Sequence, residues 1–172
     1  MKFSFTSQPI DRVPAELVIL MHYQGQVPLK GLLGLIDWRV NGKISRMVEN
    51  KVFSGKAREM LLMPSEHRFK ADKLVLLGLG RKEEFEEGHI VQVFDFIFQT
   101  ASRMKSPQVC LTLSKLLPSH FEWRNAVRLF VSKLFDFPAI QEVIFCEPLD
   151  VVQEAKRRQL DFGPNVQMSF ET

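Results

Sequence analysis

Runs of apolar residues alternate with amphipathic segments along this chain. Residues 17–21 and 73–80 are apolar almost without interruption, which is the pattern of strands covered on both faces. Residues 2–6 alternate polar and aromatic side chains and predict a half-buried strand. Apolar positions in residues 89–105 recur at spacings of three and four, which predicts a long amphipathic helix that ends before Pro107.

The remaining elements follow from the same patterns. We expect further strands at residues 59–63, 108–113 and 140–146, and further helices at residues 29–40, 44–48 and 149–158. Polar residues 65–71 join two predicted strands and indicate a hairpin. Ser119 and Glu122 have the spacing of a capping box and predict that a helix begins there. This order of elements predicts an α/β fold with a mixed sheet between layers of helices.

Length and composition limit the classes of protein to consider. The chain has 172 residues, of which 45% are hydrophobic and 25% charged, and this predicts one globular domain. We expect the domain to span residues 1–160 and to be followed by an irregular tail at 161–172. The longest apolar runs are too short to cross a membrane, and no secretory signal is apparent, so we expect a cytoplasmic protein.

The polar residues do not form a recognisable catalytic or metal site. The four histidines lack the spacing of a helical metal site, and two cysteines cannot build a four-cysteine zinc site. The carboxylates of residues 83–87 are flanked by basic residues and are typical of a solvated loop. Cys110 and Cys146 lie in apolar strands, where buried, inert thiols are expected. We therefore predict no catalytic residues, no metal and no cofactor.

Several short motifs occur in an order that resembles a known family. The apolar strand at 74–80 ends in Gly-Leu-Gly and is followed by a basic and acidic stretch, Arg-Lys-Glu-Glu-Phe. Before it come the early apolar strand, a short helix containing Asp37, a Gly-Lys-Ile run at 42–44 and a Phe-Ser-Gly-Lys run at 53–56. Over roughly residues 17–147 the chain resembles the amino-terminal domain of the leucyl (cytosol) aminopeptidase family.

The resemblance carries expectations about both fold and activity. It implies a three-layer α/β/α macro-like fold with a mixed, mostly parallel central sheet, related to domains that bind ADP-ribose. In the family, the two metal ions and the catalytic residues belong to a separate carboxyl-terminal domain. The hallmark of that domain, an Asn-Thr-Asp-Ala-Glu-Gly-Arg run, does not occur in this sequence. The resemblance therefore implies a stand-alone, non-catalytic relative, and no catalytic residue can be transferred to this chain.

The Gly-Leu-Gly strand end offers a candidate ligand site. Ligands of open α/β sheets bind beyond the carboxyl ends of the strands, where glycine lets backbone amides approach a phosphate. Gly78 and Gly80 could provide such amides, and Arg81 and Lys82 could provide the opposite charge. However, the spacing fits neither a Walker motif nor a dinucleotide fingerprint, so a structural turn is the favoured interpretation.

Two other groups of residues are candidates for contacts with partners. Lys156, Arg157 and Arg158 could touch nucleic acid, although cations at a helix end also offset its dipole, and a net charge of +3 does not favour nucleic-acid binding. The 15 phenylalanines include three on one predicted helix: Phe94, Phe96 and Phe98. They form either a thick core or an exposed apolar surface for a second copy or a protein partner.

Three functional hypotheses follow. The first is a non-catalytic module for protein interaction, oligomerisation or regulation. The second is a detached regulatory subunit of a metalloaminopeptidase whose catalytic half is another chain. The third is a domain that binds a nucleotide or an ADP-ribose-like ligand near residues 78–82.

Overall fold

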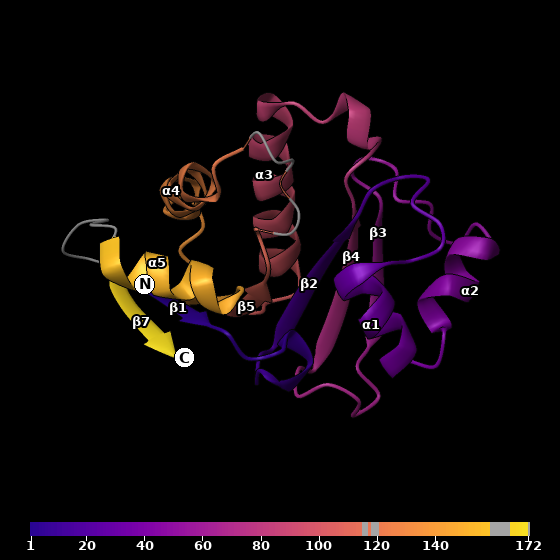
Figure 1. The fold of residues 1–172 in the computed structure, drawn as a ribbon, viewed down its shortest axis with the longest axis horizontal. Coiled ribbons are helices and arrows are strands. Elements are labelled where there is room, and N and C mark those ends of the chain that lie inside the picture. Colours follow the sequence, from indigo (N-terminus) through magenta and orange to yellow (C-terminus); the bar gives the residue numbers. More distant parts are fainter. Residues whose placement is uncertain (115–116, 118–120, 159–165, 172) are drawn as a thin grey trace.

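The chain folds into a central sheet with helices on both of its faces (Figure 1). The structure is a computed structural model, and it describes residues 1–114, 117, 121–158 and 166–171, with the side chains of Glu87 and Arg158 left out. The α/β order expected from the apolar pattern is confirmed.

All strands of the sheet run parallel except one. Their order across the sheet is β3-β4-β2-β5-β6-β1-β7, and only β3 lies antiparallel to its neighbour. The antiparallel pair β3–β4 is the predicted hairpin. The strands are β1 (Lys2–Thr6), β2 (Leu17–His22), β3 (Met60–Pro64), β4 (Lys73–Gly78), β5 (Gln108–Leu111), β6 (Glu142–Cys146) and β7 (Gln167–Glu171).

The helices are divided between the two faces of the sheet. Alternate residues of β2 point to opposite faces, so Ile19 and Met21 enter one core while Val18 and Leu20 enter the other. The first core is covered by α3 (Glu87–Arg103), α4 (Trp123–Leu134) and α5 (Leu149–Arg158). The second core is covered by α1 (Gly31–Arg39) and α2 (Lys43–Glu49). This arrangement confirms the predicted three layers.

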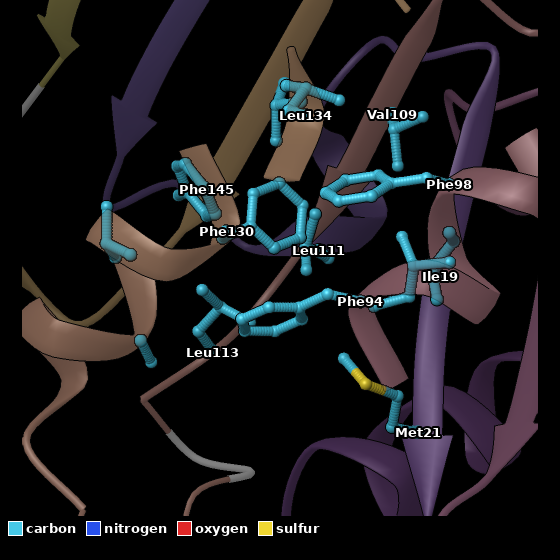
Figure 2. Close-up of a cluster of buried hydrophobic side chains, with 14 of the residues drawn as sticks. Ile19, Met21, Phe94, Phe98, Val109, Leu111, Leu113, Phe130, Leu134 and Phe145 are labelled. Carbon is cyan, nitrogen blue, oxygen red and sulfur yellow. The ribbon is translucent and has the colours of Figure 1, made fainter. Parts of the chain in front are cut away.

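The phenylalanines of α3 belong mainly to the first core. Phe94 and Phe98 are 2% and 1% exposed, and both meet the ring of Phe130 from α4 (Figure 2). Phe96 is only partly buried and also packs against this core. The interpretation as a thick core is therefore correct for Phe94 and Phe98, and their predicted role in an exposed interface is wrong. The reason is that α4 covers the stripe of α3 that carries them.

The start of one helix differs from the prediction. Helix α4 begins at Trp123, after an extended Glu122 whose side chain makes no capping bond, so a start at Ser119 is wrong. Ser119 and His120 lie outside the described residues. Phe121 instead packs its ring against Phe85, with 6.4 Å between the ring centroids, which places this part of the chain against the core before the helix starts.

The tail is also more ordered than expected. Residues Gln167–Glu171 form β7 and pair with β1, so the prediction of an irregular tail is wrong for these five residues. The pairing gives β1 a second neighbour, and Phe170 stacks on Phe5 with 5.3 Å between the ring centroids. Sequence periodicity is weak here because β7 is short and only half-buried.

Candidate functional site

A cavity of about 500 Å³ lies at the carboxyl end of β2. Its wall includes the last residues of β2, the segment from Gly25 to Pro28, the first turn of α1 and Thr112, which follows β5. Adjacent parallel strands end at the same edge of the sheet, and this is where open α/β sheets form their ligand clefts. The volume is within the usual range for small-molecule sites.

The charged side chains that line the cavity are both basic. Lys30 and Lys82 come from different elements, one at the start of α1 and the other after β4, and both are exposed. Among the described residues that line the cavity, none is acidic. These two cationic side chains therefore favour an anionic ligand.

The first turn of α1 strengthens this preference. Lys30 is the residue before the helix, and its side chain does not cap the amides that follow it. The first amides of any helix lack partners within the helix, and they stabilise negative charge together with the helix dipole. Gly31, Leu32 and Leu33 of this turn line the cavity, so these amides lie at its edge.

His22 lies in the wall of the cavity, with its imidazole packed on the second face of the sheet. It is 3% exposed, and its Nε2 has no hydrogen-bond partner among the described residues. Burial lowers the pKa of His22 below its usual 6.5, and the nearby Glu59 carboxylate offsets part of this effect. The imidazole is therefore held neutral, and it is a buried residue that the sequence patterns did not identify.

The depressed pKa predicts how stability varies with pH. The unfolded chain binds a proton at His22 below pH 6.5, whereas the folded chain resists it, so the free energy of unfolding should fall as the pH drops from 6.5. Chemical denaturation between pH 7.5 and 5 measures this slope. His22→Asn should flatten the slope, whereas His67→Asn, at an exposed site with positive φ that asparagine tolerates, should keep it. Equal slopes for wild type and His22→Asn would contradict the assignment.

Aromatic and apolar side chains line other parts of the cavity. Tyr23 is buried, which raises its pKa to about 12, and its ring meets the edge of Phe85 with 5.5 Å between the centroids. Val27 is 61% exposed at the rim. A ligand that occupied the cavity would therefore contact apolar surface as well as positive charge.

A buried carboxylate organises the neighbouring strand end. Glu147, directly after β6, accepts hydrogen bonds from the backbone amide of Leu113 at 2.7 Å and from that of Ser114 at 3.2 Å, and also from the Ser114 hydroxyl. Thr112 donates its hydroxyl proton to the Cys146 carbonyl at 2.7 Å. These bonds fix the chain after β5 where it joins the cavity wall. In the sequence, the only sign that Glu147 organises this strand end is its place as a polar residue directly after a buried strand.

Of the four predicted ligand residues, only one reaches the cavity. Lys82 lines it, whereas Arg81 is exposed and pairs with Glu84 at 3.4 Å. Gly78 and Gly80 pack instead against residues 55–57. The amide of Gly80 donates to the Gly55 carbonyl at 2.9 Å, and a Cβ on Gly78 would lie 2.0 Å from the Lys56 carbonyl oxygen. These contacts support the structural interpretation of both glycines.

The other candidate groups lie apart from this cavity. Lys156 and Arg157 are exposed near the end of α5, and neither they nor the backbone of Arg158 line the cavity. Their contact with nucleic acid stays a prediction. Cys110 and Cys146 are buried and form no disulfide, with 3.2 Å between the sulfur atoms, and their contact together with burial raises the pKa of the Cys110 thiol.

The described residues contain neither a metal-binding cluster nor a membrane-spanning helix. No group of three or more histidine, cysteine, aspartate or glutamate side chains in the described ranges could hold a metal ion. In the same part of the chain, no helix has both the length and the apolar character needed to cross a membrane.

Comparison with known sequences identifies relatives for most of the chain. The profile of the "Cytosol aminopeptidase family, N-terminal domain" matches residues 19–138. A probable cytosol aminopeptidase of Alkaliphilus oremlandii is 30% identical over 112 residues, which are 65% of this chain and 22% of that protein. One from Shewanella sediminis is 22% identical over 145 residues, or 82% of this chain and 29% of that protein. The first relatives are thus matched over only about a fifth of their length.

Solved structures with the same fold include aminopeptidases and macrodomains. A tomato leucine aminopeptidase mutant superposes with a TM-score of 0.65 at 11% identity, over 92% of this chain and 35% of that one. A Trypanosoma brucei macrodomain in complex with ADP-ribose gives 0.70 at 12% identity, over 91% of this chain and 68% of that one. These likenesses confirm the macro-like fold. The profile match over residues 19–138 shows that this chain belongs to the cytosol aminopeptidase family and corresponds to its N-terminal domain.

Proposed function

We propose that this chain is a non-catalytic regulatory module that binds a small phosphorylated ligand of nucleotide type. The observation that carries the proposal is the cavity at the carboxyl end of β2, whose charged lining residues in the described structure are both lysines. An open cavity at this position favours the ligand-binding hypothesis over a role confined to protein contacts.

The charge and shape of the cavity support a ligand with two chemically different parts. Lys30, Lys82 and the first amides of α1 would bind phosphate oxygens. Tyr23, Val27 and Leu117 supply apolar surface for a flat or hydrophobic group. A nucleoside diphosphate combines these two properties.

Two solved structures support the choice of test ligands. Trypanosoma brucei macrodomains that share this fold are described in complex with ADP and with ADP-ribose. At 13% and 12% identity they share the fold alone, so the ligand of this chain is inferred from its own cavity. The relatives are cytosol aminopeptidases by name, and we propose the same compartment. Peptidase activity is not proposed, because the matched profile is that of the N-terminal domain.

Calorimetry with ADP and ADP-ribose tests the proposal. We expect saturable binding that weakens as salt is added, because phosphate contacts are screened. Lys82→Ala and Lys30→Ala should each weaken binding about fivefold, as the loss of ~1 kcal/mol implies. Lys156→Ala, which removes an exposed lysine away from the cavity, is the matched control and should bind like wild type. Absence of heat with millimolar ligand would rule out these nucleotides, and an equal loss in all three variants would rule out this cavity.

A further inference from the structure

Strand β3 forms one edge of the sheet and is apolar along its length. It follows the order Met-Leu-Leu-Met-Pro from Met60 to Pro64, without a charged residue. Sheet edges in natural proteins are usually protected from pairing by lysines, by covering segments or by bulges. In β3 only the terminal Pro64 serves this purpose.

Among the described residues, no backbone group pairs with the outer edge of β3. The amide of Gly78 donates to the Glu59 carbonyl at 2.8 Å, so Glu59 faces β4. Residues of an antiparallel pair alternate between facing and turning away from the partner strand. The backbone N–H and C=O groups of Met60 and Leu62 therefore point away from the sheet.

The side chains of these two residues are also exposed. Met60 is 43% and Leu62 is 51% exposed, and both lie on the same face of β3 because they are two residues apart. This face is the one covered by α3 further along the sheet, since the Thr100 hydroxyl lies 3.7 Å from the Met60 sulfur. Met60 and Leu62 thus carry both outward backbone groups and exposed apolar side chains.

We propose that β3 pairs antiparallel with β3 of a second copy of this chain, about a two-fold axis at Leu61. In this register Met60 of each copy lies opposite Leu62 of the other, and the outward groups of the four residues form four hydrogen bonds. The exposed side chains of Met60 and Leu62 from both copies form one apolar cluster. The contact is isologous and closes as a dimer.

Charge and size both favour a second copy as the occupant. The antiparallel pairing brings the exposed Arg58, just before β3, toward the exposed Glu66, just after β3 in the other copy, whose carboxylate also pairs with Lys43 of its own chain at 2.5 Å. By symmetry this pair of opposite charges occurs twice, and no like charges meet along the strand. A five-residue strand buries less than the roughly 1,200 Å² of a stable specific interface, so the dimer should be weak and should dissociate on dilution.

Sedimentation equilibrium of the full chain from about 10 μM to 1 mM tests the proposal. Wild type should pass from monomer to dimer over this range, and Leu62→Lys should remain monomeric because it places a charge at the edge. Val52→Lys is the matched control, since Val52 is 58% exposed and lies outside β3, and it should dimerise like wild type. A wild type that is strictly monomeric at 1 mM, or a Leu62→Lys variant that still dimerises, would overturn the proposal.

A cross-linking experiment tests the register separately. In this register Leu61 of one copy lies opposite Leu61 of the other, and the two residues share no backbone hydrogen bonds. Their Cα atoms would be ~4.5 Å apart, a separation that suits a disulfide. With oxidised glutathione as the oxidant, two Leu61→Cys chains should form one disulfide while glutathione is reduced. Leu62→Cys, whose copies are offset along the strand, should cross-link at least tenfold more slowly. The native Cys110 and Cys146 are buried, so they should not compete. Equal rates for the two variants would refute the two-fold axis at Leu61.

Discussion

Phe130→Ala is expected to lower the free energy of unfolding by about 4 kcal/mol, the range found when a buried phenylalanine is cut back to alanine. Phe130 is fully buried between α4 and the sheet. Its ring meets those of Phe94, Phe98 and Phe145 with 4.9, 4.6 and 5.3 Å between centroids. Figure 2 shows the four rings in one cluster. The truncation removes these three ring contacts and leaves a cavity that the surrounding side chains cannot fill.

Urea denaturation of wild type and variant measures this effect, and Phe135→Ala is the matched control. Phe135 follows α4 by one residue and is 49% exposed, so its truncation should cost less than about 1 kcal/mol. Both variants replace phenylalanine by alanine, so the difference between their free energies of unfolding reports the effect of burial. Similar losses in both would show that α4 does not cover this core as described.

Gly78→Ala is expected to cost at least about 3 kcal/mol, the upper range for overpacking a closed site. The added methyl group would lie 2.0 Å from the Lys56 carbonyl oxygen and 2.7 Å from the Gly55 carbonyl carbon. Both obstacles are backbone atoms, so no side-chain rotation can relieve the clash. Residues 55–57 would have to move away from the end of β4.

The same substitution at Gly88 is the control for Gly78→Ala in thermal and chemical denaturation. Gly88 lies in the first turn of α3, and a Cβ there meets nothing within 4 Å. Alanine is the better helix former, so Gly88→Ala should be neutral or stabilising by about 0.5 kcal/mol. A tolerated Gly78→Ala would show that the close approach to residues 55–57 is not required by the fold.

The cavity shows what local patterns could and could not provide. Lys82 was identified from its position after the Gly-Leu-Gly strand end, and it does line the cavity. Lys30 and His22 were missed, because each lies in a segment whose own pattern reads as an ordinary helix start or strand end. They join the site because α1 and β2 meet at the same sheet edge as the end of β4.

The sequence by itself determined strands β1 to β6, the long helix and the β3–β4 hairpin, because apolar periodicity reflects the fixed geometry of the backbone within each element. The family followed from the order of its short motifs, and the profile match confirms it. Only the tertiary structure decided which residues of different elements meet. It buried Phe94 and Phe98 under α4, paired residues 167–171 with β1, and turned the glycines of β4 toward residues 55–57. These outcomes depend on strand order and on contacts between distant segments, and no local pattern carries that information.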